Sequence, residues 1–184
     1  MDAPAHVLRA RISARRLVDA VLPRYLGGTP DSLILSRDPN GRPYVAGVTL
    51  DFNLSHSGDW ALLAVASGTR VGVDVEQMRR DRDVRAIARR YFSHSEAQGI
   101  CDLADDDVAR GEFYRLWTVK EAALKALGIG IANGLADTTL NNESHVRLPD
   151  GSEMRFSEFV LEPGYPAALV AQSQHELHLR FFHL

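Results

Sequence analysis

The 184-residue sequence predicts an α+β fold in which a helix-plus-sheet pattern occurs twice. A helical pattern near the start is followed by short strand-like runs, and a helical region from about residue 83 to 128 is followed by a second set of strand-like runs. A content of 45% hydrophobic residues is enough to build one core, and no short-period repeat is present. We therefore treat residues 1–184 as a single domain with approximate halves 1–76 and 77–184.

The composition excludes several classes of protein. A formal charge of −3 without a Lys/Arg block argues against a nucleic-acid partner that is bound through its phosphates. Cys101 is the only cysteine, so an internal disulfide framework is excluded. The N-terminus lacks the long apolar core of a signal peptide or membrane span. We expect a cytoplasmic protein with no membrane partner.

The first half begins with a helix over 5–26, in which apolar residues recur at helical spacing until Gly27-Gly28 ends the pattern. Short strands are predicted at 33–36 and 43–46, on either side of an Asn40-Gly41 turn. Two further strands and their connections should complete this half.

The stretch 60–66 is uniformly apolar, which predicts a strand buried on both faces. A Ser-Gly-Thr turn then returns the chain into 70–77, so we expect a hairpin or meander that carries this last strand. In an extended strand its valines would face one way, while Asp74 and Glu76 would face the other. Taken alone, such alternation favours an edge strand with a solvated acidic face, and it is also compatible with a site that needs two carboxylates.

The second half starts with two short helices. Asp83 can cap the first, and Ser93 with Glu96 forms a capping-box pattern for the second. The next helix carries an apolar stripe from Phe113 to Leu127 and ends at Gly128. Strands are then predicted at 146–148, 155–161, 168–171 and 177–182.

Three carboxylates, Asp74, Glu76 and Glu121, are the residue type that binds Mg²⁺, which would imply a phosphate-bearing substrate. Glu121 and Lys125 lie four residues apart, so they could also form a plain helix pair that contributes only about 0.2–0.5 kcal/mol. However, Lys120, Glu121 and Lys125 all lie close to the apolar stripe, where charges are costly without partners. A bound anion and a metal ion would provide those partners.

The segment Ser55-His56-Ser57 does not predict a serine hydrolase, because it lacks a Gly-x-Ser-x-Gly elbow and no acid is placed to orient the histidine. His56 is better interpreted as a donor to a phosphate or hydroxyl, or as a structural residue.

Taken together, the order and spacing of these motifs resemble the 4′-phosphopantetheinyl transferases of the Sfp type, in the holo-acyl-carrier-protein synthase superfamily. The resemblance covers nearly the whole chain and rests on the stretches 40–43 (Asn-Gly-Arg-Pro), 52–57 (Phe-Asn-Leu-Ser-His-Ser), 71–76 (Val-Gly-Val-Asp-Val-Glu), 91–96 and 116–125 (Leu-Trp-Thr-Val-Lys-Glu-Ala-Ala-Leu-Lys).

The resemblance implies a fold of two similar halves in a pseudo-twofold arrangement, with the active site between them. It implies transfer of the phosphopantetheine arm of coenzyme A to a serine of an acyl or peptidyl carrier protein, with release of adenosine 3′,5′-bisphosphate. The metal would be Mg²⁺, held by Asp74, Glu76 and Glu121. Glu121, directly or through a water, would take the serine proton, and Lys125 would steady the phosphate or leaving group.

The same resemblance implies further contacts with the two substrates. Residues expected to contact coenzyme A are Arg37, Arg42, Asn53, Ser55, His56, Lys120 and Lys125. Residues considered for docking the carrier are Tyr91, Phe92 and Ile100, which could equally be core. The carrier could belong to fatty-acid, polyketide or nonribosomal-peptide synthesis.

One departure from the family concerns the N-terminus, where relatives have an additional strand and a basic stretch ahead of the first helix. This departure leaves a second interpretation, a coenzyme A or carrier-protein binding module with lost or weakened transfer. A third, a Mg²⁺-dependent phosphohydrolase, would use the same carboxylates. A monomer is expected, although an exposed sheet edge could pair with another chain.

Overall fold

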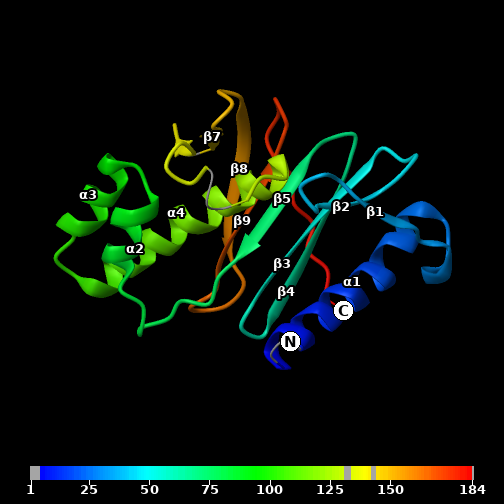
Figure 1. Ribbon diagram of the computed structural model, residues 1–184, viewed down its shortest axis with the longest axis horizontal. Coiled ribbons are helices and arrows are strands. Elements are labelled where there is room, and N and C mark those ends of the chain that lie inside the picture. Colours follow the sequence, from blue (N-terminus) through cyan, green and yellow to red (C-terminus); the bar gives the residue numbers. More distant parts are fainter. Residues whose placement is uncertain (1–4, 131–133, 142–143, 184) are drawn as a thin grey trace.

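Two helix-on-sheet units lie side by side in the computed structural model, which describes residues 5–130, 134–141 and 144–183 (Figure 1). The α+β class expected from the sequence is confirmed. No helix within these ranges combines the length and the hydropathy needed to cross a membrane.

The first unit packs helix α1 (Ala5–Leu26) on the hairpin of β3 (Leu50–Ser57) and β4 (Trp60–Ser67). A smaller hairpin of β1 (Leu35–Arg37) and β2 (Pro43–Val45) follows the 3-10 turn Pro30–Ser32. The Asn40-Gly41 turn forms as expected, with Gly41 at a φ of +86°. The core of this unit consists of Val18, Leu22 and Phe52, with apolar side chains of β1 to β4 around them.

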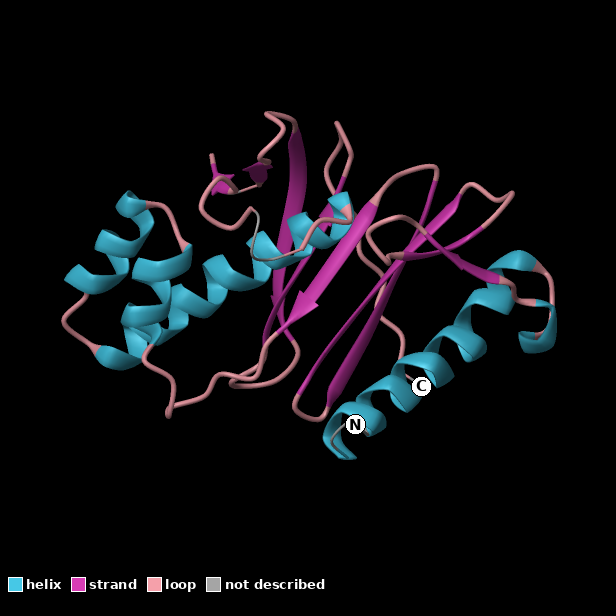
Figure 2. Cartoon of the chain, viewed as in Figure 1, coloured by secondary structure: helices cyan, strands magenta, loops and turns pink. Residues whose placement is uncertain are grey.

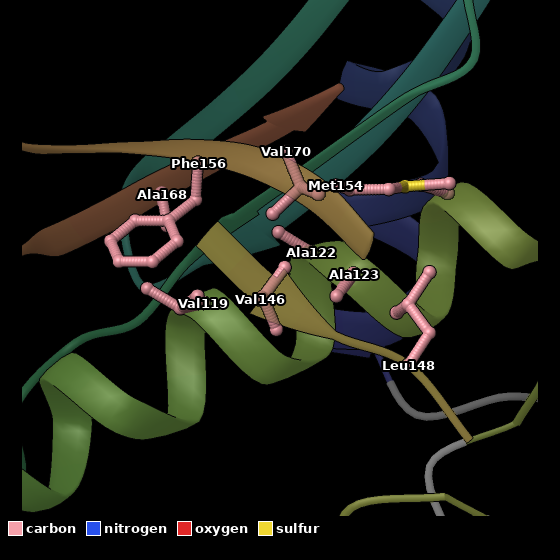
Figure 3. Packing of buried hydrophobic residues seen from close by; sticks show 10 residues of the cluster. Val119, Ala122, Ala123, Val146, Leu148, Met154, Phe156, Ala168 and Val170 are labelled. Carbon is pink, nitrogen blue, oxygen red and sulfur yellow. The ribbon is translucent and has the colours of Figure 1, made fainter. Parts of the chain in front are cut away.

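The second unit is a five-stranded antiparallel sheet of order β5-β9-β8-β7-β6. Its strands are β5 (Val71–Val75), β6 (Thr139–Leu140), β7 (His145–Arg147), β8 (Glu153–Val160) and β9 (Pro166–Ala171). The long helix α4 (Asp106–Leu127) crosses this sheet. Its small side chains, such as Ala122, pack on Val146, Phe156 and Val170, as Figure 3 shows.

Helices α2 (Val84–Tyr91) and α3 (His94–Asp102) pack against the N-terminal part of α4, away from the first unit (Figure 2). The predicted helix ends are confirmed. Asp83 caps α2, Ser93 and Glu96 form the capping box of α3, and Gly128 ends α4 with a φ of +76°.

The two units meet along one edge of β5, and the contact is made by side chains. Amides of alternate β5 residues and of Gln77 donate over 2.8–3.3 Å to alternate β3 side chains: Val71 to Asp51, Val73 to Asn53, Val75 to Ser55 and Gln77 to Ser57. We call these four bonds the side-chain ladder. It satisfies backbone donors that would otherwise be buried without partners.

The expected hairpin or meander that would carry β5 is therefore wrong. β5 pairs with β9, Val71 opposite Ala171, and does not pair with β4. By hydrogen bonding the strand that carries Asp74 belongs to the second unit, whereas the division at 76/77 had placed it in the first.

Helix α4 approaches β5 most closely at Gly72. A Cβ atom at this position would lie 1.9 Å from the carbonyl oxygen of Ala122 and 2.7 Å from the amide nitrogen of Ala126. Glycine is thus required here by close backbone contact.

Two other strand predictions are corrected. Residues 60–66 lie in β4, but among them only Ala64 is buried, because β3 and β4 form a narrow two-stranded sheet whose side chains stay partly exposed. No strand forms at 177–182, where Phe182 is 74% exposed. The preceding strand β9 already has β5 and β8 on its two edges, so this segment cannot extend the second sheet beside β9. Residues 178–182 instead line a cavity together with residues 61–65 of β4.

Candidate active site

Strand β5 presents its two faces to different surroundings. Val71 and Val73 pack against apolar residues of β4, and Val75 packs beside Tyr165. Gly72 and Asp74 lie on the other face, toward α4. The predicted alternation of valines and carboxylates is confirmed for these residues.

Asp74 is almost fully buried, at 1% exposure. Its Oδ1 accepts hydrogen bonds from Ser55 Oγ at 2.8 Å and from Lys125 Nζ at 2.6 Å. Its Oδ2 is buried and has no hydrogen-bond partner among the residues that the structure describes. Burial raises the pKa of Asp74, and the Lys125 ammonium opposes that rise.

Glu76 follows directly after β5, and its Oε2 accepts a hydrogen bond from Ser57 Oγ at 3.1 Å. Its pKa is raised by burial and then by the charge of Asp74. The two carboxylates therefore repel each other in their ionised forms.

Glu121 is supplied by α4 and is 6% exposed. Its pKa is raised to about 8 by burial, with the charges of Asp74 and Glu76 acting in the same direction. Lys125, one turn later, places its Nζ 3.9 Å from Glu121 Oε2. The predicted helix pair exists, but as part of a larger cluster: Asp74, Glu76, Glu121 and Lys125, held at the junction of the two units.

The residues of this cluster fit Mg²⁺ by type. Three carboxylates that are destabilised by burial and by one another gain from a cation, and the unpartnered Oδ2 of Asp74 is a free oxygen ligand. Their spacing is not yet that of a metal centre, since the described ranges hold no group of three acidic, histidine or cysteine side chains close enough to bind one ion. The Lys125 ammonium lies on Asp74 instead.

Lys120 lies on a different side of α4 and is fully buried. Its Nζ donates to Glu96 Oε2 at 2.6 Å and to Leu135 O at 2.9 Å, and lies 4.7 Å from the centre of the Phe92 ring. Burial lowers its pKa, and Glu96 opposes that effect. Lys120 therefore has partners within the protein and ties α4 to the capping box of α3.

Arg42 is also engaged internally. Its guanidinium binds both carboxylate oxygens of Asp51, at 2.7 and 2.8 Å, and donates to the carbonyl oxygens of Phe52, Val71 and Lys125. It clamps β3, β5 and α4 together. Its side chain is only 5% exposed, and Nε, Nη1 and Nη2 each donate to a protein oxygen.

Arg37 is exposed and donates to Gly41 O. It lines a cavity of about 910 Å³ together with Arg70, Thr69 and Gln172. This cavity includes neither Asp74 nor His56, so the structure does not join the arginines and the carboxylates in one pocket.

His56 and Asn53 occupy opposite faces of β3. Asn53 is buried, and its Oδ1 accepts a hydrogen bond from the Val73 amide. His56 is exposed and shares the face of Phe52 and Leu54, which pack toward α1. His56 is thus not brought against Asp74.

Sequence reasoning missed Ser57, Asp51 and Glu96, each of which binds one of the predicted site residues or its strand. Alternate polar residues in an otherwise apolar strand, from Asp51 to Ser57, were the available signal. Of the residues considered for docking a carrier, Phe92 and Ile100 are buried in the core, at 5% and 1% exposure.

Comparison with known proteins gives a consistent result. A family model described as the 4′-phosphopantetheinyl transferase superfamily matches residues 70–179, and one described as the N-terminal part of a 4′-phosphopantetheinyl transferase matches residues 6–68. The change from one match to the other falls just before β5, where the two units meet.

Three relatives illustrate the similarity. The chain is 36% identical over 181 residues to a 4′-phosphopantetheinyl transferase of Bacillus pumilus, covering 91% of this chain and 75% of the relative. It is 37% identical over 134 residues to one of Nostoc sp. (70% and 55%) and 32% identical over 145 residues to one of Bacillus subtilis (76% and 63%). The chain thus spans less than two thirds of the latter two proteins.

Proposed function

Since this chain belongs to the 4′-phosphopantetheinyl transferase superfamily, we propose that it transfers the 4′-phosphopantetheine group of coenzyme A to a serine of an apo acyl or peptidyl carrier protein. The product released from coenzyme A is adenosine 3′,5′-bisphosphate. The enzyme acts as a monomer on these two substrates, which size-exclusion chromatography can check.

The observation that carries this proposal is the buried cluster at the junction of the two units. It combines three carboxylates with one ammonium, Lys125, next to a carboxylate oxygen that has no hydrogen-bond partner within the described part of the chain. Such a set suits a reaction in which a phosphoryl group moves and negative charge builds up on the leaving oxygen.

In the proposed reaction the carrier serine oxygen forms a bond to the phosphorus that bears the pantetheine arm. The bond from that phosphorus to the bridging oxygen breaks, and the adenosine bisphosphate leaves with the electron pair. Glu121 in its ionised form accepts the serine proton, directly or through a water. Burial and the charges of Asp74 and Glu76 raise its pKa to about 8, and a cation bound beside it would favour the ionised form. Lys125 stabilises the charge on the transferred phosphate or the leaving group.

Asp74, Glu76 and Glu121 are the residues that would hold Mg²⁺, with Oδ2 of Asp74 as the oxygen already free. When bound, the ion supplies neutralisation of the pyrophosphate charge. Lys125 Nζ is paired with Asp74 Oδ1, and it would be available to a phosphate if that carboxylate held the ion.

For coenzyme A we propose that Arg37 and His56 contribute outer contacts, because both are exposed. Asn53 retains its amide NH₂ for a further contact, since only its Oδ1 is used. Arg42 and Lys120 act through the framework, because each is buried and binds protein oxygens of other segments.

The test is an incubation with coenzyme A, Mg²⁺ and a panel of apo carrier proteins, followed by mass spectrometry. We expect the mass of the phosphopantetheine arm on at least one carrier, and its loss in Asp74→Ala and Glu121→Gln. Asp59→Ala, an exposed position in the β3–β4 turn, is the matched control and should retain activity. Coenzyme A binding without transfer to any carrier, or phosphopantetheine released into water, would contradict the proposal.

A further inference from the structure

Two serines of β3, Ser55 and Ser57, belong to the side-chain ladder. They also bind the carboxylates of Asp74, in β5, and of Glu76, directly after it. We propose that Ser55 and Ser57 are positioning residues, each of which holds one oxygen of Asp74 or Glu76 so that the other oxygen is presented to a metal ion. This inference rests on the proposed function, because it concerns the same carboxylates.

The two serines use one repeated hydrogen-bond pattern. The Val75 amide donates to Ser55 Oγ at 3.3 Å, and Ser55 Oγ donates to Asp74 Oδ1 at 2.8 Å. Two residues further along both strands, the Gln77 amide donates to Ser57 Oγ at 2.9 Å, and Ser57 Oγ donates to Glu76 Oε2 at 3.1 Å. At both positions each hydroxyl therefore accepts from a backbone amide and donates to a carboxylate, so the amide fixes its orientation toward that carboxylate.

The hydroxyl of Ser55 has no capacity left for a substrate phosphate. A hydroxyl has one donor and two acceptor lone pairs. Ser55 Oγ donates to Asp74 and accepts from Val75 N and from Lys125 Nζ, the latter at 3.0 Å. The expectation that its side chain contacts coenzyme A is therefore replaced by a role within the protein.

The choice of residue along β3 matches this role. Asp51 and Asn53 in the same ladder accept β5 amides through carboxylate or amide oxygens, which cannot donate to a carboxylate. Serine hydroxyls can accept and donate at once, and they occur at the two positions where β5 offers an acidic neighbour. Residues that orient metal ligands in this way typically contribute about 10–100-fold to metal affinity.

The test compares Ser55→Ala and Ser57→Ala with the wild type in two calorimetric titrations. One measures Mg²⁺ binding to the full chain saturated with coenzyme A, and the other measures coenzyme A binding in EDTA. We expect the Kd for Mg²⁺ to rise by about 10–100-fold in both variants, while the Kd for coenzyme A in EDTA stays unchanged. Ser67→Ala, at the exposed end of β4, should leave both constants unaltered.

An unchanged Kd for Mg²⁺ in both alanine variants would overturn the inference, as would a fall in coenzyme A affinity in EDTA. If Ser55→Ala does not fold, Ser57→Ala still decides, with Ser57→Thr expected to restore Mg²⁺ affinity because it keeps the hydroxyl. Failure of the proposed function has a separate signature, in which the wild type binds Mg²⁺ but loads no carrier. The serine effect on Mg²⁺ binding would then persist and support the inference.

Discussion

Gly72→Ala should both destabilise the protein and impair its active site, because the added methyl group meets the backbone of α4. The Cβ would lie 1.9 Å from Ala122 O, and contact distances become ordinary only from 3.4 Å, so the helix must move by roughly 1.5 Å. Overpacking costs about 1–3 kcal/mol and more where backbone must shift, so we expect a loss near 3 kcal/mol. Glu121 and Lys125 directly precede the displaced residues Ala122 and Ala126, and a shift of about 1 Å can lower a rate about 10²-fold.

The assay is urea unfolding together with the rate of carrier loading. Gly111→Ala is the matched control, because Gly111 lies in the same helix and a methyl group added there would have nothing within 4 Å, so this variant should stabilise the chain by about 0.5–1 kcal/mol. A Gly72→Ala protein with wild-type unfolding free energy would refute the reasoning that α4 is held against β5 by this contact.

Two further predictions concern charges. Arg42→Ala should lower the unfolding free energy by about 3–5 kcal/mol, because it leaves the largely buried Asp51 carboxylate without its guanidinium partner. Arg37→Ala, at an exposed position, should change it by less than about 0.5 kcal/mol. Equal effects of the two variants in urea unfolding would contradict the proposal that Arg42 holds β3, β5 and α4 together. For Glu121, the folded pKa of about 8 exceeds the ordinary 4.5, so the folded state binds more protons and stability falls as pH rises between these values. In EDTA the Glu121→Gln variant should therefore lose less stability than the wild type between pH 5 and pH 8, and parallel curves would show that Glu121 titrates normally.

Local signals predicted the ends of helices and turns well, because a cap or a turn is decided by residues within four positions of it. The capping box of Ser93 and Glu96 and the left-handed Gly128 are examples. Strand pairing was harder to predict, since Val71 finds its partner at Ala171, across the whole second unit. The segment 177–182 looks like a strand in sequence, but both edges of the preceding strand β9 are already occupied.

The candidate site shows the same limit at the level of single side chains. Lys120 and Lys125 lie on one helix beside one apolar stripe, and nothing in the sequence tells them apart. The rotation of α4 against the sheet decides that Lys125 reaches Asp74 while Lys120 reaches Glu96. The sequence alone likewise suggests that Arg42 contacts a phosphate. Its actual partners could not be predicted, because the carbonyl oxygens that surround it come from three separate segments.

The side-chain ladder gives β5 two independent sets of amides, which exchange with solvent through different motions. Residues at even positions face β9, as the Glu76 amide does in donating to Pro166 O, whereas odd positions from 71 to 77 donate to β3 side chains. Deuterium uptake at odd residues therefore reports separation of the two units, and uptake at even residues reports opening of the second sheet. Comparing deuterium uptake at odd and even residues of this one short strand thus shows which of the two events occurs first.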